Sequence, residues 1–179
     1  MSPPELIELG RVDFITIDTI GPPGKRTFFL QAAQGNTLIT LIIEKEHAAA
    51  LSIAIRGLLE QLSEGEAEIK DKPEPANMDL IHPMEPLFRV GQMGLGYDEA
   101  QDMVIIMVEE LTQEREQRGT RVHIWGSRIQ MAALAHQAAV AVASGRPVCP
   151  LCSEPIDPGE EHVCVKGNGR KRLYKTDGN

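Results

Sequence analysis

Three cysteines and one histidine near the C-terminus carry the clearest chemistry in the sequence. Cys149 and Cys152 form a CxxC pair, and His162 and Cys164 follow as an HxC pair. The CxxC spacing lets two thiolates converge on one metal ion from a tight turn, and residues two apart on a strand point to the same face. We therefore predict that Cys149, Cys152, His162 and Cys164 hold one Zn²⁺. Because four protein ligands leave no open position for an activated water, this zinc would be structural.

Two features of this predicted zinc site stay open. Asp157 is the alternative fourth ligand if His162 faces away, although carboxylates are uncommon beside thiolates in structural zinc sites. The CxxC pair could also be a redox dithiol or two unpaired thiols, but no βαβ pattern surrounds it and a second ligand pair lies just downstream. The odd number of cysteines, with none in the first 148 residues, argues against a disulfide framework.

The predicted zinc ligands follow two groups of strands, and each group ends in a helix. Alternating apolar residues indicate the strands, and apolar residues at helical spacing indicate the helices. The first group has three strands and a helix, at residues 13–20, 26–33, 37–43 and 45–62. The second group has the same elements at residues 87–97, 102–111, 121–125 and 129–143. We predict an α+β fold in which two βββα repeats pack as one domain, with a continuous sheet and both helices on one face, followed by a small C-terminal zinc knuckle.

Apolar stripes predict which face of each helix is buried. On the first helix the stripe comprises Ala48, Leu51, Ile55, Leu58, Leu59 and Leu62. On the second helix it comprises Ile129, Ala133, His136 and Val140. Small residues would let the two helices approach closely, although the helix propensity of alanine is an equally good explanation for most of them. These residues are Ala48, Ala49, Gly57, Ala132, Ala135 and Ala139.

Composition sets the predicted domain boundaries. Residues 1–144 form the body, with repeats at about 11–62 and 87–144 joined by a charged, proline-rich connector at 63–86. Residues 145–179 form the zinc-binding knuckle and a basic tail. The cations of that tail are Lys166, Arg170, Lys171, Arg172 and Lys175.

The overall composition is that of an ordinary soluble globular protein. The 179 residues are 42% hydrophobic and 25% charged, and their net charge is −8. The sequence has no apolar run of ~20 residues and no signal-peptide pattern, so we expect a cytoplasmic protein without a membrane segment. The negative charge and an aromatic content of 4% argue against nucleic-acid binding. Basic tails can bind nucleic acid, however, so a nucleic-acid-binding protein remains an alternative.

Other candidate groups have simpler structural explanations. The glycines of residues 91–96 could form a phosphate loop, but a strand rather than a helix is predicted to follow, so a bulge or a close backbone contact is favoured. No histidine has a Ser, Cys or Asp at a spacing that predicts a catalytic group, and we assign no catalytic residue. An acidic set could bind a divalent cation but is explained by its turn and strand-end positions. This set comprises Asp98, Glu99, Asp102, Glu109 and Glu110.

Several segments resemble a bacterial family catalogued as domain of unknown function 3090. The most specific is Gly145-Arg146-Pro147-Val148-Cys149-Pro150-Leu151-Cys152 with Pro155, Asp157-Pro158, His162-Val163-Cys164 and Asn168-Gly169. Residues 26–32, 44–46, 88–91 and 95–98 resemble other recurrent segments of that family. The resemblance spans almost the whole chain. It implies no activity, because that family is uncharacterised.

These observations predict a cytoplasmic zinc-binding protein that acts as a non-catalytic interaction or accessory protein, with another protein as its partner. One alternative is an enzyme with an active site between the two repeats, acting on phosphorylated small molecules. The other is a nucleic-acid-binding zinc module. A pocket between the repeats lined by acids, His or Arg would favour the enzyme, whereas exposed apolar residues beside the zinc would favour the interaction protein.

Overall fold

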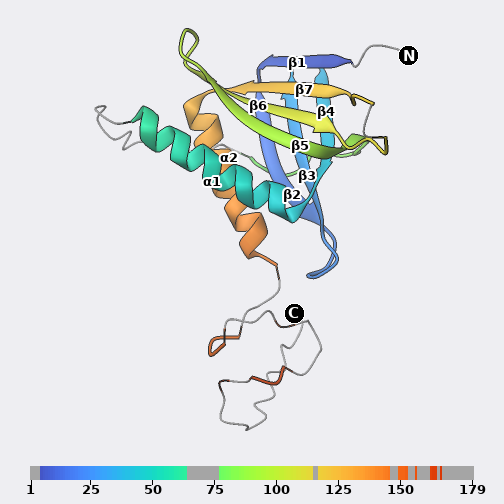
Figure 1. The fold of residues 1–179 in the computed structure, drawn as a ribbon, viewed down its shortest axis with the longest axis vertical. Coiled ribbons are helices and arrows are strands. Elements are labelled where there is room, and N and C mark those ends of the chain that lie inside the picture. Colours follow the sequence, from blue (N-terminus) through green and yellow to red (C-terminus); the bar gives the residue numbers. More distant parts are fainter. Residues whose placement is uncertain are drawn as a thin grey trace.

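The computed structural model describes residues 5–63, 77–114, 117–145, 149–152, 156, 162–164 and 166, which form an α+β fold (Figure 1). Its strands are β1 (Leu6–Arg11), β2 (Phe14–Ile20), β3 (Thr27–Gln34), β4 (Thr37–Ile43), β5 (Pro86–Asp98), β6 (Met103–Glu110) and β7 (Arg121–Gly126). Its helices are α1 (Lys45–Leu62) and α2 (Arg128–Ala143). None of the helices in these ranges is long and apolar enough to cross a membrane.

Strand β1 is the element that the sequence-based prediction lacks. Residues Leu6–Arg11 pair in parallel with β7, where Leu6 lies opposite Arg121. The segment has only six residues and includes a glycine and two charged side chains. Its pairing partner lies more than a hundred residues away in the sequence, so no local pattern marks it as a strand. The element order therefore has four strands before α1 and three before α2.

The strands form one sheet in the order β1-β7-β6-β5-β4-β3-β2. Neighbouring strands are antiparallel except for two parallel pairs, β1 with β7 and β4 with β5. The first residues of β5 pair with β4, whereas Val90 and the residues after it pair with β6. The single continuous sheet agrees with the sequence-based expectation.

The two edges of this sheet meet. Edge strands β1 and β2 are consecutive in the chain and are separated only by Val12 and Asp13. The Val12 amide donates to the Trp125 carbonyl of β7 at 2.9 Å, and the Asp13 amide donates to the Ala33 carbonyl of β3 at 2.8 Å. The adjacent residues Val12 and Asp13 thus bond to strands near the two opposite edges of the sheet. The sheet is therefore curled and nearly closed.

One hydrophobic core lies between the curled sheet and the helices. Burial of large aliphatic side chains stabilises the fold by about 1.5–3 kcal/mol for each fully buried one. The largest apolar side chains with less than 2% exposure come from six strands and both helices: Ile17, Leu30, Leu41, Ile43, Ile55, Val90, Val104, Ile106, Ile124, Met131 and Leu134.

Helices α1 and α2 cross in direct contact (Figure 1). Ser52 of α1 is buried, and its hydroxyl donates to the Ala135 carbonyl of α2 at 2.7 Å. Ala48, which was predicted on the buried stripe of α1, is buried, and so is Ala135 of α2, whereas Gly57 is exposed and a Cβ there would meet nothing within 4 Å. Gly57 therefore plays no part in the close approach of the helices.

The predicted buried face of α2 is wrong. Ile129 is 40% exposed, Val140 is 43% exposed and His136 also faces solvent. The buried residues of α2 are Met131, Leu134, Ala135, Ala138 and Ala141. Because alanines occur all around this helix, its sequence has little apolar periodicity, and packing of the larger Met131 and Leu134 selects the face.

The end of the predicted connector packs against the outer side of the sheet. Gln31 of β3 is fully buried, and its side-chain amide donates to the Ile81 carbonyl at 3.0 Å and accepts from the Ile81 amide at 2.8 Å. Buried Thr16 of β2 donates to the Met78 carbonyl at 2.5 Å. Residues 78–81 thus satisfy polar groups that the sheet buries on its outer face.

Candidate metal centre

The C-terminal residues that the structure describes bring together one group of metal-ligating side chains. The three sulfur atoms and the imidazole nitrogen of Cys149, Cys152, His162 and Cys164 all lie within 4.8 Å of one another. Ligands around a tetrahedral Zn²⁺ are about 3.5–3.8 Å apart, given Zn–S and Zn–N bonds of about 2.3 and 2.0 Å. These four side chains could hold one metal ion with small adjustments.

Cys149 has the most complete environment of the four. Its side chain is fully buried, and backbone amides of the CxxC turn donate to its sulfur. The amide of Cys152 and then that of Leu151 stabilise the thiolate, which lowers the pKa of Cys149 to about 6 despite the opposing effect of burial. Since the thiolate is the form that binds metals, the turn prepares this sulfur for coordination.

His162 faces the cysteines. Its Nε2 atom lies 3.2 Å from the sulfur of Cys152, and both side chains are half-buried. Cys149 and Cys164 are buried together with Ile156 in a small apolar cluster, separate from the core of the body. All three cysteines are free thiols rather than disulfides. The alternative ligand Asp157 and most of the basic tail lie outside the described residues.

Two apolar side chains next to the ligands face outwards. Leu151, between Cys149 and Cys152, is 44% exposed, and Val163, between His162 and Cys164, is 63% exposed. Each ligand pair therefore presents an apolar residue at the surface of this cluster.

The glycines of residues 91–96 lie within β5, and β6 follows them. The pairing register of β5 with β6 shifts between Val90 and Gln92, so Gly91 occupies a bulge. A Cβ at Gly91 would lie 2.9 Å from the backbone of Leu111. This confirms the predicted bulge and close backbone contact, and the phosphate-loop reading is wrong because no helix follows the glycines.

The acidic set does not form a metal group among the described residues. Asp98 accepts a bond from the Gln101 amide at 3.1 Å, as a turn residue does. Asp102 accepts bonds from Tyr97 and Arg128, and Glu110 accepts one from the Thr120 amide. Local structure therefore explains these carboxylates.

The other histidines have structural positions. His47 accepts a bond from the Glu44 amide at 3.2 Å and so helps to cap α1. His123 of β7 lies 3.6 Å from the carboxylate of Glu8 on β1. His82 and His136 are exposed.

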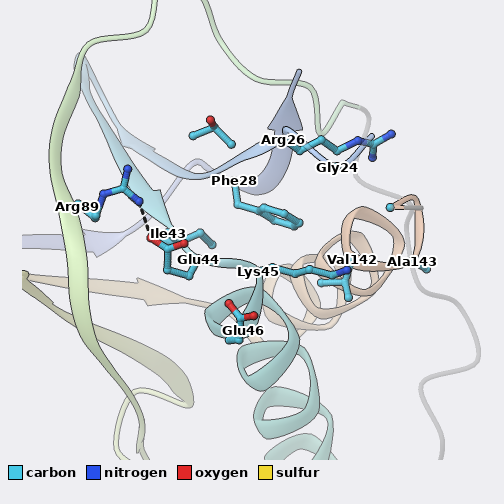
Figure 2. A pocket seen from close by; sticks show the side chains of 12 residues that line it. Gly24, Arg26, Phe28, Ile43, Glu44, Lys45, Glu46, Arg89, Val142 and Ala143 are labelled. Carbon is cyan, nitrogen blue, oxygen red and sulfur yellow. Dashed lines mark hydrogen bonds and ion pairs between the residues drawn. The ribbon is translucent and has the colours of Figure 1, made fainter. Parts of the chain in front are cut away.

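Sequence reasoning did not identify a pocket at the start of α1. This pocket (Figure 2) has a volume of about 740 Å³, and its walls come from the β2–β3 loop, β3, the end of β4, the start of α1, β5 and the end of α2. Its charged lining comprises three cations and two carboxylates, and these come from separate parts of the sequence, so no motif predicts that they meet: Arg26, Lys45, Arg89, Glu44 and Glu46.

Comparison with known proteins agrees with the resemblance seen in the sequence. No curated protein and no solved structure matches the chain. A family model described as "Protein of unknown function (DUF3090)" matches residues 7–164, from β1 to the last residue of the Cys/His group. The protein therefore belongs to the DUF3090 family.

Proposed function

We propose that this protein is a non-catalytic, zinc-containing interaction protein of the cytoplasm, whose C-terminal module holds one structural Zn²⁺. The observation that carries the proposal is the convergence of the ligand atoms of Cys149, Cys152, His162 and Cys164 within 4.8 Å. Three thiolates and one imidazole are a common ligand set of structural zinc. Softer thiolate ligands also disfavour Mg²⁺ and Ca²⁺, which bind oxygen ligands.

The closed ligand set supports a structural role. With four protein ligands the zinc has no position left for a substrate or an activated water. The exposed apolar side chains of Leu151 and Val163 beside the ligands support contact with another protein, because a partner that covered them would remove their apolar surface from water. In this proposal the metal fixes the two short segments that present these side chains.

Metal analysis of the intact protein tests this proposal. Protein purified under reducing conditions without chelator should contain close to one zinc per chain, measured by elemental mass spectrometry. Cys152→Ser should lose most of the metal, because a closed structural site depends on each thiolate. His162→Ala should also lose metal, whereas the matched variant His136→Ala, at an exposed histidine of α2, should keep it.

Two results would contradict the proposal. One is a zinc content near zero in the unmodified protein. The other is full metal retention by Cys152→Ser. Asp157→Ala decides the fourth ligand, because it should retain zinc if His162 coordinates and lose it if Asp157 does.

We also propose that the body consists of two βββα repeats. Its support is a matched pairing pattern: residues 6–20 begin beside β7 in parallel and continue beside β3 antiparallel. Strand β5 likewise begins beside β4 in parallel and continues beside β6 antiparallel. The first strand segment of each proposed repeat thus starts next to the last strand before the helix of the other repeat: residues 6–11 lie beside β7, and the start of β5 lies beside β4. Superposition of residues 86–143 on residues 6–62 tests this relation, and a failure to align α2 with α1 would contradict it.

A further inference from the structure

The three thiols of the Cys/His group differ in how far solvent reaches them. Cys149 and Cys164 are buried, whereas Cys152 is half-buried. All three are free thiols, and the chain has no other cysteine. Oxidation of a cysteine by a small oxidant such as a peroxide depends on its thiolate character and on its exposure. Cys152 is therefore the sulfur of this group that a dissolved oxidant reaches first.

The sulfur of Cys149 lies next to that of Cys152. The thiols of Cys152 and Cys164 both donate hydrogen bonds to the Cys149 sulfur, and all the ligand atoms of the group lie within 4.8 Å of one another. Only Pro150 and Leu151 separate Cys149 from Cys152, which is the CxxC spacing of redox dithiols. Because the two sulfurs of a disulfide are about 2.05 Å apart, a small movement within this one turn can join them.

A disulfide between these two cysteines would leave too few ligands for the metal. The thiolate is the form of cysteine that binds metals, so both sulfurs of the disulfide cease to be ligands. Of the four ligands only His162 and Cys164 would remain. A structural zinc site needs four protein ligands, so the metal would leave.

We propose that Cys152 is the site at which peroxides oxidise this protein, and that a Cys149–Cys152 disulfide then releases the Zn²⁺. This inference rests on the proposed function, because it concerns the zinc assigned to the same four residues. Loss of the zinc frees the two short segments that present Leu151 and Val163. The proposed contact with a partner protein is thereby sensitive to oxidants.

The reaction has two steps, and its atoms and electrons balance. In the first step the Cys152 thiolate attacks one oxygen of hydrogen peroxide, the O–O bond breaks, and Cys152 becomes a sulfenic acid while hydroxide leaves. In the second step the Cys149 thiolate attacks the Cys152 sulfur, the S–S bond forms, the S–O bond breaks, and a second hydroxide leaves. The two sulfurs together lose the two electrons that the peroxide oxygens gain, and Zn²⁺ keeps its charge.

The consequences are confined to the C-terminal group. Cys149, Ile156 and Cys164 form an apolar cluster that is separate from the core of the body. The body contains no cysteine. Measurements of thiols and of zinc on the full chain therefore report on this site alone.

Treatment of the zinc-loaded full chain with hydrogen peroxide tests the inference. Zinc release is followed with a chromogenic chelator, and the oxidised residues are mapped by mass spectrometry. Zinc should leave while the three free thiols fall to one, because Cys149 and Cys152 form the disulfide. Dimedone, which traps sulfenic acids, should label Cys152. Reduction in the presence of zinc should restore the site, since a disulfide is reversible whereas a sulfinic acid is not.

Two matched variants separate Cys152 from the other thiols. Cys152→His and Cys164→His each exchange one thiolate for an imidazole, which also binds zinc. After metal analysis has shown that both hold zinc, Cys152→His should keep it under peroxide, because its remaining thiols are the two buried ones. Cys164→His should lose zinc as the unmodified chain does, because its CxxC pair is intact. The dimedone label on the unmodified chain decides the question independently of these variants.

Three results would overturn the inference. The first is a zinc-loaded chain that retains its metal after peroxide treatment. The second is a dimedone label on Cys149 or Cys164 in place of Cys152. The third is loss of zinc from Cys152→His as fast as from the unmodified chain. A chain that holds no zinc before the treatment overturns the zinc proposal as well, so the two failures are distinguishable.

Discussion

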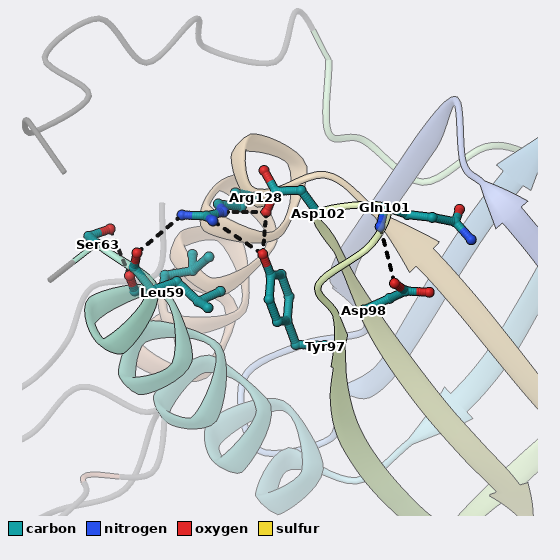
Figure 3. Close-up of polar contacts among 8 residues, drawn as sticks. Leu59, Ser63, Tyr97, Asp98, Gln101, Asp102 and Arg128 are labelled. Carbon is teal, nitrogen blue, oxygen red and sulfur yellow. Dashed lines mark hydrogen bonds and ion pairs between the residues drawn. The ribbon is translucent and has the colours of Figure 1, made fainter. Parts of the chain in front are cut away.

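Arg128 joins three elements through one side chain (Figure 3). Arg128 lies at the start of α2, and its Nε donates to Asp102 in the β5–β6 turn at 2.6 Å. Its terminal nitrogens donate to the Tyr97 hydroxyl at 3.2 Å and to the Leu62 carbonyl of α1 at 3.4 Å. Tyr97 donates to the same Asp102 oxygen at 2.6 Å. These bonds, first that from Tyr97 and then those from Arg128, hold the pKa of Asp102 below its ordinary value of 3.8. The Asp102 carboxylate thus helps to hold together α1, α2 and the β5–β6 turn where they meet.

We expect Asp102→Asn to lower the melting temperature by about 1–3 °C at neutral pH, since the ion pair is solvent-exposed and such pairs contribute little. Asn suits this position because residue 102 has a φ of 51°, a conformation that Asn tolerates. A carboxyl whose folded pKa is lowered stabilises the fold above its unfolded pKa and loses that effect as the pH falls through the folded value. The difference between the two proteins should therefore shrink below about pH 3.8.

Thermal unfolding followed by circular dichroism between neutral and acidic pH measures this difference. Glu99→Gln, in the same turn, is the matched control and should behave like the unmodified protein at each pH. A difference that persists unchanged at the acidic end would mean that the charge of Asp102 is not the cause.

At the scale of elements, the contact between α1 and α2 depends on small side chains. Ser52 is 4% exposed, and its hydroxyl reaches the backbone of α2. A larger side chain at this position would push the helices apart and would leave the Ala135 carbonyl without its bond. Gly57, one turn further along α1, lies outside the contact.

Two variants of α1 should therefore change stability in opposite directions. Ser52→Leu should lower the free energy of unfolding by about 1–3 kcal/mol through overpacking. Gly57→Ala should raise it by about 0.5–1 kcal/mol, because it improves helix propensity without a steric clash. Chemical denaturation of both variants measures these changes. A stabilised Ser52→Leu would show that the helices do not pack as described.

The elements also show which parts of the fold the sequence could predict. Strand β4 and helix α1 begin and end at the predicted residues, because a β-branched run follows the Gly35-Asn36 turn and a clear apolar stripe follows that run. The face of α2 was not predictable from an alanine-rich helix. The sequence also predicted that Cys149 and His162 lie close together, because ligand spacing is a local signal. The pocket around Arg26 was not, because its walls meet only after the sheet has curled.

At the scale of the whole molecule, two separate apolar clusters divide the described chain. The body core draws on all seven strands and both helices, and none of the residues described after α2 belongs to it. Cys149, Ile156 and Cys164 form the second cluster. The body thus contains all the residues of its own core.

A chain truncated after Gly145 should therefore keep a single cooperative thermal transition, since it retains the complete body core. Differential scanning calorimetry of this fragment and of the full chain tests the expectation. Treatment of the full chain with a metal chelator should likewise leave the main transition in place. Loss of cooperativity in the truncated chain would show that the segment with the Cys/His group is part of the folding unit.

The pairing of β1 with β7 determines when folding can finish. As a ribosome makes the chain, residues 6–11 emerge before the other strands, but their partner at residues 121–126 emerges after the other strands. Pairing of segments so distant in sequence is entropically costly and slow, and an unpaired strand edge favours association with other chains. Until β7 is synthesised, the nascent chain therefore exposes β1, and newly made protein is most exposed to aggregation and to chaperones in this interval.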